Sequence, residues 1–132
     1  MRRIKKKIRP VKWKIYLTMK TIREIITANQ NEILRGNLLP QRAAEMMTEL
    51  SAVIGNLNDE ITKRDMEYNK VLLEHYDREA TANRAKIKAG TTPEYEAMRT
   101  ARNTKELAIE LIRSLKYFLK SAEEERQTSR FQ

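Results

Sequence analysis

The single histidine is the first residue of this sequence that could take part in acid–base chemistry or bind a metal ion. His75 lies in the stretch "EHYD", beside Glu74 and two residues before Asp77. A metal site on one helix needs a second histidine four residues away, so that both rings share a face, and none is present. Because adjacent residues of a helix point in different directions, these three side chains do not converge. We therefore interpret His75 as a surface or seam residue and expect no metal site.

A second candidate is the stretch "NDEITK", which has the composition of a nuclease carboxylate cluster. It contains Asp59 and Glu60. A Mg²⁺ site needs carboxylates that converge from several elements of structure, whereas these two belong to one predicted helix. Lys63 follows Asp59 by about one helical turn and can form an ion pair with it. We interpret the stretch as a solvated helix face.

Other motifs typical of enzymes are missing from the sequence. The chain has no cysteine, so disulfide bonds and thiolate chemistry are excluded. It has three glycines and neither GxGxxG nor GxxxxGK[ST], the loops that hold phosphate groups. No apolar run approaches the roughly 20 residues of a membrane-spanning helix. The sequence predicts a non-enzymatic cytoplasmic protein with no cofactor, no small-molecule substrate and no membrane span.

The strongest signal for binding is the charge of the first 20 residues, "MRRIKKKIRPVKWKIYLTMK". This segment contains nine of the 27 Lys and Arg residues and no Asp or Glu. Removing these nine leaves 18 basic residues, equal to the 18 acidic ones, so residues 21–132 have a formal net charge of zero. A cationic segment attracts phosphates without reading base sequence. The candidate nucleic-acid contacts are Arg2, Arg3, Lys5, Lys6, Lys7, Arg9, Lys12, Trp13 and Lys14.

Three partners fit residues 1–18, which we call the basic arm. The first is nucleic acid, because interleaved Lys and aromatic residues combine phosphate contact with base stacking. Trp13 and Tyr16 alternatively attach the arm to the rest of the chain. An anionic membrane surface is the second partner, although Pro10 interrupts the spacing that a surface helix needs. An acidic protein is the third. Met19 could itself be the start, which would make the arm an upstream extension without function.

Beyond the arm, the sequence is patterned for long helices. Apolar residues at helical spacing predict a helix over 19–35, which Gly36 and Asn37 end. Further apolar residues predict one continuous helix over 41–89, about 70 Å long at 1.5 Å per residue. Such a length exceeds any globular core that this chain can build, so we expect it to pair with other helices.

A short connection after this long helix indicates an antiparallel hairpin. Thr92 fits the N-cap and Pro93 the first position of a third helix, which we expect to run to about Glu125. Counting outward from Gly90 places Tyr68 near Leu111. The predicted fold is all-α, with the arm at 1–18, a helical hairpin and a shorter N-terminal helix at 19–126, and a polar tail at 127–132.

The long predicted helix also has an apolar seam, with residues at alternating three- and four-residue steps as in coiled coils. The third helix covers only about two thirds of it, so we expect the rest to contact a protein partner or a second copy. The candidate interface residues are Met47, Leu50, Ile54, Leu57, Ile61, Tyr68 and Leu72.

Residues 45–126 resemble small helical proteins of tailed bacteriophages that are encoded among recombination and replication genes. The matching features are Glu67-Tyr68, the small residues near Gly90, the helix start from Thr92 to Glu96, and "IRSLK" from Ile112 to Lys116. The resemblance implies an accessory protein that works with DNA-processing enzymes in the cytoplasm of an infected host. It carries over no catalytic residue.

We therefore expect a phage-like accessory protein that associates with nucleic acid through the arm and with a partner protein through its helices. The alternative is a protein-interaction module without a nucleic-acid role, either an inhibitor of a host enzyme or a structural part of a virion. Loss of binding on removal of the arm distinguishes the two.

Overall fold

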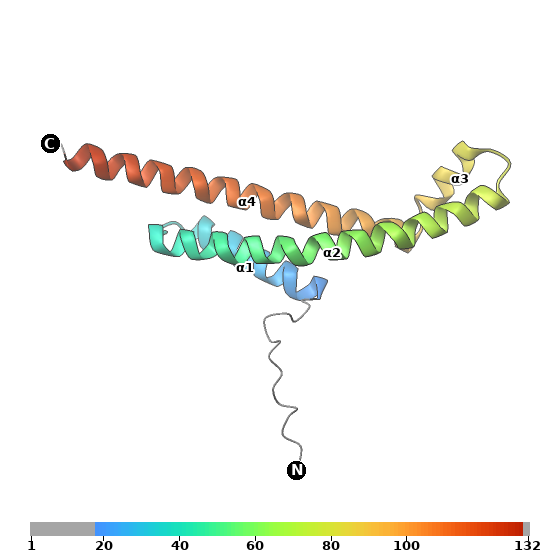
Figure 1. Cartoon of the computed structure of the whole chain (residues 1–132), viewed down its shortest axis with the longest axis horizontal. Helices are drawn as coiled ribbons and strands as arrows, with labels where there is room; N and C mark the ends of the chain where they lie inside the picture. The colour runs from blue at the N-terminus through green and yellow to red at the C-terminus, as the bar shows by residue number, and fades with distance from the viewer. Residues whose placement is uncertain (1–17, 131–132) are drawn as a thin grey trace, which may run out of the picture.

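The structure is a computed structural model, and we describe residues 18–130 (Figure 1). Within these residues there are four helices and no strands: α1 (Met19–Arg35), α2 (Pro40–Arg78), α3 (Ala82–Ala89) and α4 (Pro93–Arg130). The two long helices, α2 and α4, run antiparallel and pack against each other, and α1 lies along the N-terminal half of α2 (Figure 1). The predicted all-α helical hairpin with a shorter N-terminal helix is confirmed.

The first predicted helix has the bounds expected from the sequence, because residues at both of its ends satisfy backbone groups. Thr18 is its N-cap, and its hydroxyl accepts a hydrogen bond of 3.2 Å from the backbone N–H of Thr21. At the other end, Gly36 has a φ of +78°, in the left-handed region that favours glycine. The backbone N–H of Gly36 donates to the carbonyl of Ile33, so the chain turns away before α2 begins at Pro40.

The prediction of one continuous helix over 41–89 is wrong. α2 ends at Arg78, the chain reverses, and α3 packs back against α2. Thr81 caps α3, since its hydroxyl accepts a hydrogen bond of 3.1 Å from the backbone N–H of Arg84. The reversal buries Ala85 and Ala89 completely, because their methyl groups allow α3 to approach closely. The chain therefore turns about ten residues earlier than the sequence pattern indicates.

The predicted pairing of the hairpin is consequently wrong as well. Tyr68 lies against Tyr95, with ring centroids 5.3 Å apart, and not near Leu111. Asp65 pairs with Arg102 across the hairpin at 2.7 Å. The pairing register differs from the prediction because residues 79–89, which we expected to continue the long helix, form a turn and α3.

The start of α4 agrees with the prediction and its end does not. The Thr92 hydroxyl accepts a hydrogen bond of 3.3 Å from the backbone N–H of Tyr95, and Pro93 is the first residue of the helix. The helix continues beyond Glu125 to Arg130, so residues 127–130 of the expected polar tail are helical. This last part passes the N-terminal end of α2 and is exposed (Figure 1).

The core lies where α1 covers the α2–α4 pair. Ile22 and Ile26 of α1 are 1% and 2% exposed. Burial of one such side chain stabilises the fold by about 1.5–3 kcal/mol. Within the described residues, the part of α2 beyond Leu57 contains no fully buried side chain. The core residues contributed by α2 and α4 are Ala43, Met46, Leu50, Val53, Leu57, Ala108, Leu111 and Leu115.

Candidate interaction surfaces

The predicted nucleic-acid contacts, from Arg2 to Lys14, lie outside the described residues. The charges of the helical body, residues 19–130, matter for these contacts, because carboxylates that already have a cationic partner are less available to the arm. Within the described part of the chain, ten carboxyl groups lie within 4.0 Å of a guanidinium or ammonium group of the body itself. They are Glu32, Glu45, Glu49, Glu60, Asp65, Glu67, Glu74, Glu79, Glu110 and Glu123.

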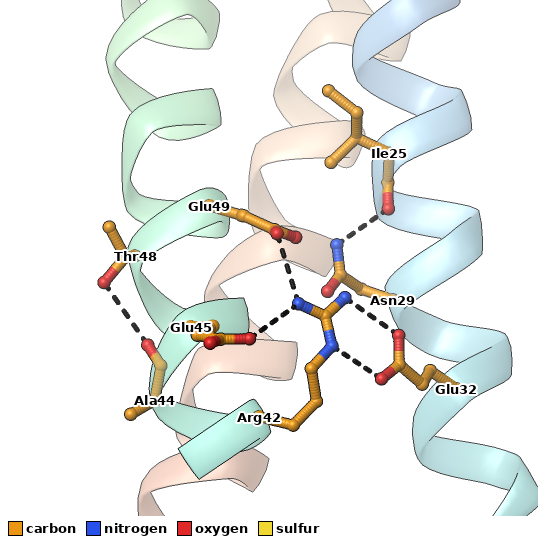
Figure 2. A network of polar contacts seen from close by, with 8 residues as sticks. All are labelled: Ile25, Asn29, Glu32, Arg42, Ala44, Glu45, Thr48 and Glu49. Atoms are coloured by element: carbon orange, nitrogen blue, oxygen red, sulfur yellow. Dashed lines mark hydrogen bonds and ion pairs between the residues drawn. The ribbon is translucent and has the colours of Figure 1, made fainter.

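The largest of these networks joins α1 to α2 at Arg42 (Figure 2). Its guanidinium donates two hydrogen bonds to Glu32, of 2.6 and 2.9 Å, in the bidentate geometry that is strong for this pair. It also contacts Glu45 at 3.4 Å and Glu49 at 3.3 Å. The hydrogen bonds from Arg42 hold the pKa of Glu32 below its usual value. Arg42 therefore links the end of α1 to the start of α2.

A second network holds α3 in place at the turn after α2. The carboxylate of Glu79 lies 3.2 Å from Lys88 Nζ and 3.2 Å from Arg84 Nε. The hydrogen bond from Lys88 is the main cause that lowers the pKa of Glu79, and Arg84 adds to it. Because Glu79 precedes α3 and Lys88 lies near its end, the interactions span most of the helix.

We expect Glu79→Gln to loosen α3 without unfolding the hairpin. The amide keeps the size of the side chain but loses the charge that attracts two cations. Backbone amides of α3 should exchange with deuterium several times faster, while those around Leu50 stay unchanged, as measured by hydrogen exchange with mass spectrometry. Because the folded-state pKa of Glu79 is lowered, its stabilisation is present above about pH 4.5 and is lost as the pH falls below that value.

Glu96→Gln is the matched control, because Glu96 has no ion pair among residues 18–130 and lies on the neighbouring helix. Equal exchange in the two variants, or no effect of Glu79→Gln, would contradict a role for Glu79 in holding α3.

The predicted interface residues fall into two groups. Leu50 and Leu57 are 0% exposed, so they are core residues of this chain and not surface contacts for another one. They are buried in the hydrophobic core that residues of α1, α2 and α4 form together. Ile61, Tyr68 and Leu72 are half-buried against the hairpin, as are the two remaining residues, Met47 and Ile54.

A different face of α2 exposes apolar side chains. Met66 is 59% exposed, Leu73 is 61% exposed and Tyr76 is 37% exposed. Sequence analysis missed this face, although its signal is present as a second series of four- and three-residue steps. The series consists of Thr62, Met66, Asn69, Leu73 and Tyr76. We call these five residues the outer seam of α2.

The two stretches considered for catalysis show no convergence of chemical groups. Within residues 18–130, no three His, Asp or Glu side chains are arranged to hold a metal ion. The His75 Nδ1 atom is buried and has no hydrogen-bond partner in this part of the chain. Asp59 and Glu60 lie on α2, and Glu60 accepts a hydrogen bond of 2.7 Å from Arg64.

Comparison with known proteins found no matching family, no similar curated protein and no similar solved structure. Among the described residues, no helix combines the length and the apolar character needed to cross a membrane.

Proposed function

We propose that this protein is a non-enzymatic accessory factor that binds nucleic acid through its basic arm. The carrying observation is the separation of charge along the chain. The first 20 residues contain nine basic and no acidic residues, whereas residues 21–132 have equal numbers of both. A polyanion is the partner that such a segment attracts most strongly, because each phosphate contact releases a counterion.

The ion pairs of the helical body support the proposal. Arg42, Arg64 and Arg102 each bind carboxylates of the body, at 2.6, 2.7 and 2.7 Å. These carboxylates already have cationic partners and are therefore less available to the arm. The body then provides a rigid support, and the arm provides an affinity that does not depend on base sequence. We further propose a role beside DNA-processing enzymes, which is what the phage-like pattern of residues 45–126 implies.

Deletion of residues 2–17 tests the proposal. This deletion keeps Thr18, whose side chain caps α1, so the helical body should remain folded. We expect the full chain to shift a labelled DNA or RNA oligonucleotide at moderate salt, and we expect the deleted chain to lose this binding. The measurement is a gel-shift or fluorescence-anisotropy titration, with circular dichroism as the check on helix content.

A variant that keeps the arm and changes the body is the matched control. Lys105, Lys116 and Lys120 of α4 have no ion pair within residues 18–130, and their replacement by Gln should leave binding nearly intact. Binding that survives deletion of residues 2–17, or that is absent from the full chain, would refute the proposal.

The second candidate function is a protein-interaction module without a nucleic-acid role. The exposed apolar residues of the outer seam of α2 favour it, since large apolar side chains on one helix face commonly mark a contact surface. The same deletion separates the two functions, because the outer seam lies far along the chain from residues 2–17.

A further inference from the structure

The C-terminal half of α2 has large apolar side chains that the rest of its own chain does not bury. All fully buried residues of α2 lie between Ala43 and Leu57. Beyond this point α1 is absent, and α2 is supported by the start of α4 and by α3 (Figure 1). This part of the helix nevertheless contains Met66, Leu73 and Tyr76, which are between 37% and 61% exposed. The apolar content of the segment therefore exceeds what its own chain covers.

The exposed residues are spaced for helix pairing. The outer seam runs from Thr62 to Tyr76 with successive steps of four, three, four and three residues, which is the spacing of a coiled-coil seam. It is distinct from the half-buried residues Ile61, Tyr68 and Leu72, which face the hairpin. Two seam residues are polar, Thr62 at its start and Asn69 in its middle.

The seam is complementary to itself when two copies run antiparallel. A twofold axis near position 71 places Met66 opposite Tyr76 of the second copy and Asn69 opposite Leu73. This register brings together the apolar residues Met66, Leu73 and Tyr76 of both copies, whereas Thr62 lies beyond the end of the partner's α2. The contact between Met66 and Tyr76 is also favourable, because methionine sulfur packs well against aromatic rings.

The charges beside the seam fit the same register. Lys63 and Asp77 flank the seam on one side, and the axis places Lys63 of each copy next to Asp77 of the other. Neither residue has an ion pair within residues 18–130 of its own chain. Near the axis, Lys70 lies next to Lys70 of the second copy. Both side chains are exposed to solvent, so their repulsion is weak.

We propose that the outer seam of α2 is the interface of an antiparallel homodimer. The seam is short, about 21 Å at 1.5 Å per residue. A contact of this length falls at or below the lower end of stable interfaces, about 1,200 Å². The dimer is therefore weak, with a dissociation constant in the micromolar range, and its population depends on protein concentration.

The mass of the nuclease-treated full chain in solution tests the proposal. Sedimentation velocity from low micromolar to several hundred micromolar protein should show a shift from monomer to dimer. Met66→Lys combined with Leu73→Lys should abolish the dimer and leave helix content unchanged, because both side chains are exposed. Leu34→Lys, at a 77% exposed position on α1, is the matched control and should dimerise normally.

Charge exchange tests the register. Lys63→Asp or Asp77→Lys alone should raise the dissociation constant about tenfold, since two attractive pairs become repulsive. The variant with both substitutions should restore dimerisation. Each pair then again joins an acidic and a basic side chain, with their positions exchanged. A single variant that had lost its fold would not regain dimerisation when the second substitution is added.

A cysteine at the axis gives an independent readout, since the chain has no cysteine of its own. Lys70→Cys should form a disulfide-linked dimer rapidly under mild oxidation, whereas Lys120→Cys on α4 should not. A monomer at all concentrations would overturn the proposal, as would a dimer that persists with lysines at positions 66 and 73. Neither result depends on the binding of nucleic acid by the arm.

Discussion

Leu57→Ala is expected to be among the most destabilising single truncations in α2. Leu57 is 0% exposed and is the last buried residue of α2 along the chain. Removal of a leucine side chain from such a site costs about 2–5 kcal/mol, because apolar contacts are lost and a cavity remains. This loss is a large part of the typical stability of a single domain, which is about 5–15 kcal/mol.

The effect should extend beyond the cavity itself. Leu57 belongs to the same cluster as Ile22 and Ile26, through which α1 is attached to the hairpin. We therefore expect the backbone amides of α1 to lose protection from hydrogen exchange along with those of α2. The measurement is urea unfolding followed by circular dichroism at fixed protein concentration, combined with hydrogen exchange.

Leu34→Ala is the control for the same change in chemistry at an exposed site. Leu34 is 77% exposed on α1, and surface substitutions of this kind change stability by about 0.5 kcal/mol or less. Equal destabilisation by both substitutions would contradict the burial of Leu57 that the structure describes.

The second large effect concerns salt. If the nine cations of the first 20 residues all contact phosphates, the logarithm of the affinity falls with the logarithm of salt concentration with a slope of about −8. If half of them engage, the slope is about −4. Affinity should therefore drop by several orders of magnitude between low and moderately high salt. Titrations of one oligonucleotide at several salt concentrations measure this slope.

Replacing Lys5, Lys6 and Lys7 by Gln should make the slope less steep by about three. The matched replacement of Lys105, Lys116 and Lys120 removes the same charge from α4 and should leave the slope unchanged. A similar change in both variants would show that the net charge of the protein, and not the arm, determines binding. That result would contradict the proposed role of the arm.

The sequence alone was sufficient to predict the local features of this protein. Thr92 and Pro93 mark the start of α4, and Gly36 marks the end of α1, because caps and positive φ angles depend on single residues and their immediate neighbours. The apolar spacing of residues 19–35 likewise predicted α1 correctly. The division of charge between the first 20 residues and the rest of the chain is also a property of the sequence.

The turn at Glu79 was decided by tertiary structure. The segment "REATANRAK" is compatible with a continuous helix, and Thr81 is a weak local signal. The helix ends there because reversal buries Ala85 and Ala89 and brings Lys88 to Glu79. Local sequence patterns cannot predict this stabilisation, because it arises from contacts between helices.

The separation of core from surface along α2 was also decided by tertiary structure. Leu57 and Leu72 belong to the same predicted apolar seam of one helix, yet Leu57 is 0% exposed and Leu72 is only half-buried. Spacing determines which residues share a face of a helix, but it does not determine which neighbour covers that face. That depends on where α1 and α4 lie, and hence on a pairing register that follows from the turn at Glu79.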